Sequence, residues 1–286
     1  LFMILIMLMI EERRGYLAAI VLVFIFFLGL SLFINLPALY RNFLFADQAV
    51  YYAMTQSIAH DGDLEYTAKD LHRYYRDFDA GPQGIFLKKG KDQKIYYAKS
   101  FAYSLFAAPF FRIGGPNGFL VFHSLLLLLV LLAGFRYLNL MTRPNVSLSF
   151  ILTFLFASLA WIYFFWITPD FFNLCLVFLA LFLWLYKLQK TEPDPAPAKK
   201  NRLLIFLYSN WSEYLASFIA GIAFVSKPPN IVIMGPLVLW ALLGKKFIKA
   251  LALGCFFLLG VALLFGANSL SVSYTHLRAH ETVLDL

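Results

Sequence analysis

GYLAAIVLVFIFFLGLSLFINLP, residues 15–37, is the stretch that decides the fold class of this chain. It carries no charged side chain. It is long enough for a helix to cross the hydrocarbon core of a bilayer, which takes about 20 mostly apolar residues. The whole chain is 61% hydrophobic and only 14% charged, which lies far outside the range of soluble domains. We therefore predict an all-α integral membrane protein.

Six further apolar stretches complete a predicted bundle of about seven transmembrane helices. A long polar segment, residues 39–116, separates the first helix from the second, and we expect this segment to carry interfacial helices. The six stretches lie at roughly 117–138, 146–166 and 170–186, and within 203–226, 230–243 and 250–267.

Lysine and arginine residues predict the orientation of this bundle. The connection 167–169 carries no cation, and 226–229 carries Lys227 alone. By the positive-inside rule the cation-rich connections face the cytoplasm. Residues 187–202 are therefore expected in the cytoplasm and 39–116 outside, in a multi-pass protein of the inner or plasma membrane. The cation-rich connections contain Arg13, Arg14, Arg136, Arg143, Lys187, Lys190, Lys199, Lys200, Arg202, Lys245, Lys246 and Lys249.

The two ends of the chain are interpreted apart from the membrane region. Residues 1–14 are interpreted as an N-terminal stub, and 15–270 as the membrane region. Residues 271–286 look artefactual, because most of this tail resembles a translated sequencing adapter. Excluding the tail also excludes His276 and His280, whose spacing would otherwise suggest metal ligands. We expect the natural protein to be longer.

The net charge of +8 invites comparison with nucleic-acid-binding proteins. Here the cations stand beside apolar spans, so they are interpreted as orienting the helices and touching anionic lipid headgroups. No nucleic-acid partner is expected. Cys175 and Cys255 both fall within apolar runs, where they are expected to act as small apolar side chains.

The outside segment begins with FADQAVYYAMTQSIAHDGDLEY, residues 45–66. Its apolar side chains recur with helical spacing, which predicts an amphipathic helix lying on the membrane surface. Asp47 stands just before this helix, and Gly62 marks a turn after it. One face is formed by Val50, Ala53, Met54, Ser57 and Ile58, at positions i, i+3, i+4, i+7 and i+8.

This segment resembles polytopic glycosyltransferases of the C superfamily (GT-C) in three features. They are an acid beyond the first span, a helix that contains tyrosine, and the run TQSIAHDGDL from Thr55 to Leu64. The chain is similar to protein mannosyltransferases and to lipid A aminoarabinose transferases. Asp47 and Tyr51 match the Asp and the Tyr of the family's G-D-E-P-H-Y motif. Gln48 stands where the family has Glu, so the second carboxylate of that motif is missing.

Three later segments extend the resemblance. YYAKSFAYSLFAAPFFRIGG, residues 96–115, resembles the family's approach to the second span. TPDFFNLCLVFLALF, residues 168–182, resembles its short outside loop with Pro and an acid. AGIAFVSKPPNIVIMGPL, residues 220–237, resembles its G-L-A-x-x-x-K-P segment.

The resemblance implies an inverting transfer of a sugar from a polyprenyl-phosphate donor on the outer face, without a cofactor. The acceptor would be a lipid, a glycan or a protein, and membrane lipids would be further partners. Asp47 is the candidate general base, although an Asp at this position is also a common helix cap. Asp170 is expected to support Asp47 or bind the acceptor, or to complement the dipole of the fourth helix.

The donor phosphate requires fixed positive charge, for which Lys99, Arg112 and Lys227 are the candidates. The alternative is that they only contact headgroups, with Lys227 snorkelling to the interface. Tyr51 is the remaining substrate-binding candidate. Asp61 and Asp63 form a D-x-D pattern found in metal sites, but Gly62 fits a turn better, so a divalent metal is not indicated.

Two other classes of function compete with the transferase. A transporter or flippase for a lipid-linked substrate predicts charged or Gly/Pro-broken positions near mid-membrane. Pro236 interrupts the sixth stretch, but ionisable residues at mid-span are nearly absent. A membrane scaffold without activity would not need the acid, helix and DGD arrangement of the outside segment.

Overall fold

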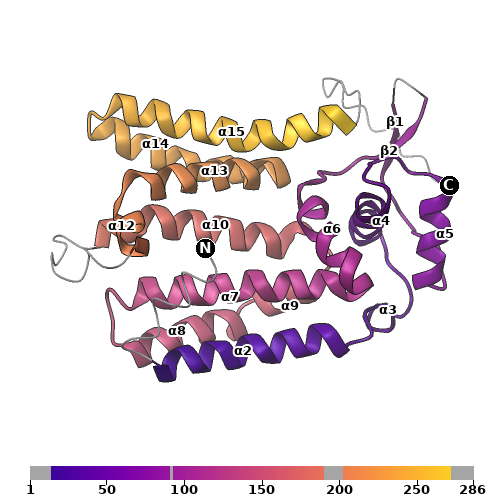
Figure 1. The fold of residues 1–286 in the computed structure, drawn as a ribbon, viewed down its shortest axis with the longest axis horizontal. Coiled ribbons are helices and arrows are strands. Elements are labelled where there is room, and N and C mark those ends of the chain that lie inside the picture. The colour runs from indigo at the N-terminus through magenta and orange to yellow at the C-terminus, as the bar shows by residue number, and fades with distance from the viewer. Residues whose placement is uncertain (1–13, 91–92, 190–201, 272–286) are drawn as a thin grey trace.

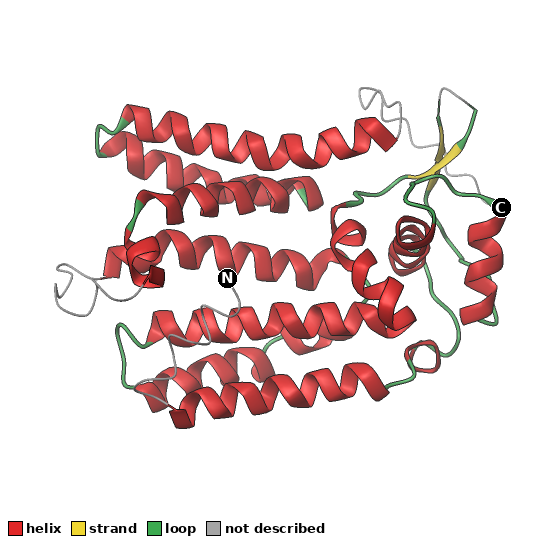
Figure 2. Cartoon of the chain, viewed as in Figure 1, coloured by secondary structure: helices red, strands yellow, loops and turns green. Residues whose placement is uncertain are grey.

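The computed structural model describes residues 14–90, 93–189 and 202–271. Long helices lie side by side in a bundle, and a smaller assembly of helices and one two-stranded sheet covers one end of it (Figures 1 and 2). The bundle helices are α2 (Arg14–Phe33), α7 (Gly118–Leu138), α8 (Pro144–Ala157), α9 (Ala160–Phe165), α10 (Pro169–Leu185), α12 (Arg202–Tyr208), α13 (Asn210–Ser226), α14 (Met234–Leu243) and α15 (Phe247–Ser271).

The end assembly comes from the polar segment between α2 and α7. Strands β1 (Leu87–Lys89) and β2 (Ile95–Tyr97) pair antiparallel, with Lys88 opposite Tyr96. The short 3-10 helix η1 (Gly115–Asn117) joins the assembly to α7, and η2 (Tyr186–Gln189) and η3 (Pro228–Ile233) lie in the bundle. The assembly contains α3 (Leu36–Leu39), α4 (Asp47–His60), α5 (Ala68–Asp77), β1 (Leu87–Lys89), β2 (Ile95–Tyr97) and α6 (Ala102–Gly114).

The all-α membrane class agrees with the structure, but seven spans do not emerge from it. Among the described residues, four helical segments are long and apolar enough to cross a membrane. They are Gly15–Phe33, Ala102–Leu138, Pro169–Gln189 and Phe247–Phe265. Two shorter apolar segments, Pro144–Ala157 and Pro228–Leu243, lie beside them. The expectations for 1–13, 190–201 and 272–286 fall outside the described residues.

Serine side chains divide two of the expected spans. Ser158 is extended between α8 and α9, and its Oγ accepts a hydrogen bond from Ala160 N at 3.1 Å. Ser209 divides 203–226 in the same way, because its Oγ accepts from Trp211 N and caps α13. A serine hydroxyl offers the backbone an alternative to the helical ladder, which a count of apolar residues does not detect.

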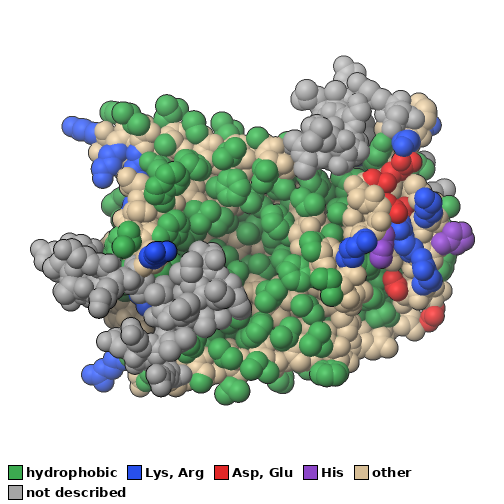
Figure 3. Space-filling model, in the orientation of Figure 1, with side chains coloured by type: hydrophobic (Ala, Val, Ile, Leu, Met, Phe, Trp, Pro, Cys, Tyr) green, Lys and Arg blue, Asp and Glu red, His purple; other side chains and the backbone are tan. Residues whose placement is uncertain are grey.

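The surface of the bundle is apolar between two charged ends. Figure 3 shows a broad hydrophobic area across the bundle, with charged side chains at either end of the view. Large apolar side chains on α2 and α15, such as Phe26, Ile248 and Leu251, are exposed. A continuous apolar surface of this kind is expected where lipid tails replace water.

At the end of the bundle opposite the assembly, one buried carboxylate joins three helices. Glu213 is only 3% exposed, and it forms ion pairs with both Lys187 and Lys249. These residues come from α13, η2 and α15. Burying a carboxylate is costly unless it is paired and hydrogen-bonded, so the three segments are held together here.

The spacing of apolar residues in α4 predicted a helix on the membrane surface, and this prediction is wrong. All side chains from Ala49 to Ser57 are buried, and α4 lies in the middle of the end assembly, beside α6 (Figure 1). Its polar residues are hydrogen-bonded: Thr55 Oγ1 donates to Tyr51 O at 2.6 Å, and Gln56 Nε2 donates to Asp77 at 3.0 Å. Paired polar groups can be buried at little cost, so a polar face does not require solvent.

We predict that the packing of α13 on α15 depends on Gly260, a residue of α15. A Cβ on Gly260 would come within 2.3 Å of Phe218 O, whereas a Cβ on Gly254 would meet no atom within 4 Å. Gly260→Ala should therefore destabilise the protein by about 1–3 kcal/mol through overpacking. Gly254→Ala, in the same helix, should leave stability unchanged or raise it. Thermal unfolding of both variants in detergent measures the difference, and equal midpoints would contradict the prediction.

Candidate active site

Asp47 stands at the junction between the bundle and the end assembly. It is the first residue of α4, and the N-cap position belongs to Ala46, which makes no side-chain cap. Ala46 has φ +49°, a sparsely populated conformation for a residue other than glycine, and its N–H donates to Gln83 O at 2.8 Å. The Asp47 carboxylate instead forms an ion pair with Lys99 Nζ at 3.0 Å. The described contacts therefore do not give Asp47 the capping role.

Asp170 occupies the first turn of α10. Thr168 is the N-cap and Pro169 follows it, a residue preferred at the first helical position. Thr168 Oγ1 donates to Asp170 Oδ2 at 2.8 Å, and Lys227 pairs with Asp170 Oδ1. A carboxylate at a helix N-terminus is stabilised by the helix dipole. The position of Asp170 therefore suits both a partner of the helix dipole and a carboxylate that takes part in a reaction.

Tyr40 fixes the turn that carries Asp170. Its hydroxyl donates to Phe165 O at 2.5 Å and accepts from Ile167 N at 3.3 Å. Tyr40 follows α3, so this contact ties the entry of the end assembly to the α9–α10 turn. The segment that leads to Asp47 and the turn that leads to Asp170 are thereby held to each other.

The two lysines come from segments that contact each other. Ser100 Oγ donates to Val225 O at 2.7 Å, which brings the residue after Lys99 beside the end of α13. Lys99 Nζ also lies 4.4 Å from the centre of the Phe86 ring. Lys227 has an extended backbone, as expected for a residue before proline.

Tyr51 lies within electrostatic range of both carboxylates. Burial raises the pKa of its hydroxyl far above the ordinary value, and the charges of Asp47 and Asp170 raise that pKa further. The structure therefore brings five of the six candidate residues into one region, which we name the carboxylate–lysine cluster. Its members are Asp47, Tyr51, Lys99, Asp170 and Lys227.

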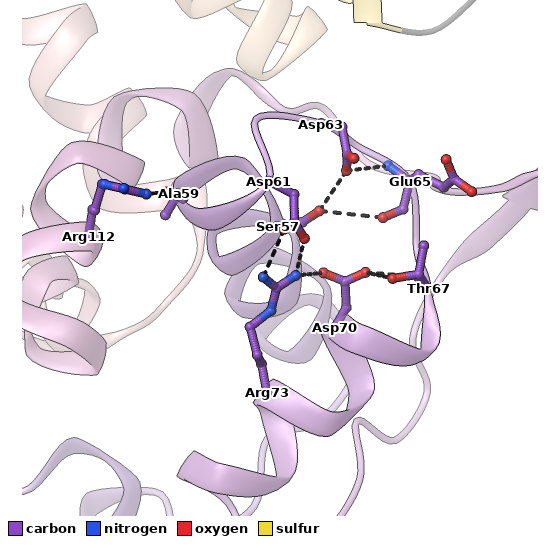
Figure 4. Close-up of polar contacts among 9 residues, drawn as sticks. All are labelled: Ser57, Ala59, Asp61, Asp63, Glu65, Thr67, Asp70, Arg73 and Arg112. Carbon is purple, nitrogen blue, oxygen red and sulfur yellow. Dashed lines mark hydrogen bonds and ion pairs between the residues drawn. The ribbon is translucent and has the colours of Figure 1, made fainter.

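Arg112, the sixth candidate, does not belong to this cluster. Its guanidinium donates to Ala59 O at 2.5 Å, near the C-terminal end of α4 (Figure 4). Asp47 begins the same helix twelve residues earlier, which corresponds to about 18 Å along the axis. Arg112 therefore contacts the other end of α4 and cannot share a phosphate with Lys99.

Asp61 and Asp63 are engaged by protein groups (Figure 4). Arg73 pairs with Asp61 and with Asp70, and its hydrogen bonds lower the pKa of the Asp61 carboxyl. Asp63 accepts from Ser57 Oγ at 3.0 Å and from Glu65 N at 3.2 Å. Gly62, with φ +74°, forms the turn between them. Over the described parts of the chain, no group of three or more potential metal ligands comes together.

A polar network beneath the cluster was not anticipated from the sequence. Asn173, buried in α10, donates to Pro169 O at 2.7 Å and to Ser226 Oγ at 2.8 Å. Asn230 Nδ2 donates to Asn173 Oδ1 at 2.7 Å and to Ala223 O at 2.9 Å. These bonds hold α10 against the segment that carries Lys227. The sequence did contain a signal for this network, namely Asn173 inside the apolar stretch 170–186, because an asparagine there is costly without a partner.

Comparison with protein-family models, curated proteins and solved structures finds no match to this chain. The chemistry of the site must therefore be argued from its geometry. The two partly exposed carboxylates can accept a proton. The lysine beside each of them can neutralise an anionic leaving group in the same region.

We predict that Asn173 and Asn230 stabilise the site as a pair. Asn173→Leu should destabilise the protein by about 1–3 kcal/mol, because buried partners lose their hydrogen bonds. Combined with Asn230→Leu, the loss should be smaller than the sum of the two single losses, with a coupling of about 0.5–3 kcal/mol. Thermal unfolding of the three variants measures this coupling, and strict additivity would mean that the contact stabilises nothing.

Proposed function

We propose that this protein is a membrane glycosyltransferase that takes its sugar from a polyprenyl-phosphate donor, with inversion at the anomeric carbon. The observation that carries the proposal is the carboxylate–lysine cluster, in which Asp47 and Asp170 each pair with a lysine close to the buried Tyr51. The resemblance of the outside segment to glycosyltransferases of the C superfamily supports the same conclusion.

The proposed reaction joins an acceptor hydroxyl to the anomeric carbon while the bond from that carbon to the phosphate oxygen breaks. Asp47 takes the proton of the hydroxyl, and the lipid phosphate leaves with the electron pair of the broken bond. Lys99 and Lys227 neutralise the negative charge that grows on this phosphate. Asp170 orients Lys227, and Tyr51 contributes to the wall of the substrate site.

A transporter for a lipid-linked substrate remains the second candidate. It is favoured by the broken helices at Ser158 and at the α13–η3 junction, since discontinuous helices often form transport sites. The transferase is preferred because the paired charges lie at the ends of apolar helices and not near their middle, where a transport site is expected. Asp170 is in the first turn of α10, and Lys227 is at the C-cap of α13.

For the membrane arrangement, we propose that α8–α9, α12–α13 and η3–α14 complete the crossings begun by the four long segments. The end with Lys187, Lys245 and Lys249 would face the cytoplasm, following the positive-inside rule. The end assembly would then face outside, where lipid-linked sugar donors present their phosphates.

Transfer should depend on the basicity of Asp47. In vitro assays with a panel of polyprenyl-phosphate sugars should detect transfer by the unaltered chain. Asp47→Asn should reduce turnover by about 10²–10⁴, the contribution typical of a general base. Glu65→Gln is the matched control, because it removes another partly exposed carboxylate that is paired with a lysine, Lys94. Near-normal turnover by Asp47→Asn would remove Asp47 from the role of base.

Labelling of single cysteines tests the orientation. In a background without Cys175 and Cys255, Lys69→Cys in the end assembly and Lys245→Cys after α14 both place a thiol at an exposed position. An impermeant maleimide added to intact cells should label the first and not the second. Labelling of both from the same side would contradict the proposed arrangement.

A further inference from the structure

A second polar site lies at the C-terminal end of α4, away from the carboxylate–lysine cluster. A cavity of about 470 Å³ opens there, within the size range of small-molecule sites. Charged side chains of both signs line it, together with an amide, an aromatic ring and the η1 turn. The lining residues are Gln56, His60, Arg73, Arg76, Asp77, Phe111, Gly115 and Pro116.

Two buried polar atoms of these residues have no hydrogen-bond partner among the described residues. Gln56 is 3% exposed, and its Nε2 donates to Asp77, which leaves Oε1 buried without a partner. Arg73 Nε is buried without a partner too. Such groups are rare in folded proteins unless a water or a ligand satisfies them. The cavity therefore offers an acceptor for an N–H or O–H group and a donor for an anionic oxygen.

The charged residues of the cavity also include an acceptor, Asp77, and a cation, Arg76. Tyr52 and Gln56 both donate to Oδ2 of Asp77, so within the described ranges Oδ1 can accept from a further donor. Arg73 is occupied by Asp61 and Asp70, whereas Arg76 forms no ion pair within the described ranges. Burial lowers the pKa of His60, and the nearby Arg73, Arg112 and Arg76 lower it further against the opposing effect of Asp61. An anion near Arg76 and His60 would relieve this repulsion.

The position of the cavity relates it to the membrane surface. Asn117, in η1, donates to Leu32 O at 3.2 Å and to Ile34 O at 2.8 Å, so η1 lies against the end of α2, the first apolar span. Phe33 and Ile113 are both 90% exposed, and they stand at the same boundary. A molecule in the cavity would thus have a polar part among charged groups and apolar chains beside these two residues.

We propose that this cavity binds a phosphodiester that carries its own N–H or O–H donor, as does the headgroup of an ethanolamine or glycerol phospholipid from the surrounding leaflet. The phosphate contacts Arg76 and Arg73. The ammonium or hydroxyl group donates to Gln56 Oε1 and Asp77. A choline headgroup has the same phosphate but no such donor, and it leaves Gln56 unsatisfied. The inference depends on the membrane placement of the protein and not on its proposed transfer reaction.

Native mass spectrometry of the purified full chain tests the proposal with phosphatidylethanolamine, phosphatidylglycerol and phosphatidylcholine of equal chain length. The first two should bind at least about tenfold more tightly than the third, the effect of charge-assisted hydrogen bonds. Arg76→Gln should weaken their binding by about tenfold or more. Lys69→Gln, on the same helix but outside the cavity lining, should not. Thermal unfolding without lipid checks that both variants are folded.

Equal affinity for the choline lipid would overturn the proposal, and so would equal binding by Arg76→Gln and Lys69→Gln. Soluble glycerophosphoethanolamine, which has the same headgroup and phosphodiester but no acyl chains, separates the two possible sources of this chemistry. If it competes only weakly with the lipid, the leaflet is the source. If it binds as tightly as the lipid, a free phosphoester is recognised and the assignment to a lipid is wrong.

Discussion

Within a bilayer, a polar group has no water to bind, and this constraint governs the rest of the structure. The polar groups inside the apolar segments therefore bind each other. Ser31 Oγ on α2 lies 2.9 Å from Ser124 Oγ on α7. His123 Nδ1 lies 2.6 Å from Phe164 O, which can only accept, so Nδ1 carries the proton and Nε2 accepts from the Tyr103 hydroxyl at 2.9 Å. Each contact joins two helices, and together they fix how the bundle packs.

The same constraint explains which features of the fold were predictable. Apolar runs such as 15–37 identify helices because a lipid-exposed backbone must satisfy its own hydrogen bonds. The breaks at Ser158 and Ser209 were not predictable from apolar content, since they depend on side-chain caps. The burial of α4 was missed for a related reason. The spacing of its apolar residues does not reveal that Gln56 Nε2 and Ser57 Oγ find acceptors on Asp77 and Asp63 inside the assembly.

The sequence was enough to select most residues of the candidate site, but not to tell which of them contact each other. Carboxylates and lysines beside apolar spans are unusual enough to be noticed one at a time. Which lysine faces which acid depends on contacts between residues far apart in sequence, such as that of Ser100 with Val225. No local pattern encodes that contact. For the same reason Arg112 seemed equivalent to Lys99, although its guanidinium binds Ala59 O at the far end of α4.

Helix α4 relates the two polar regions of the protein. The carboxylate–lysine cluster lies at its first residue, Asp47, and the cavity at its end, beside Gln56 and His60. Its fourteen residues separate the two by about 20 Å, so one phosphate cannot reach both. Each region therefore has its own cations: Lys99 and Lys227 in the cluster, and Arg73 and Arg76 in the lining of the cavity.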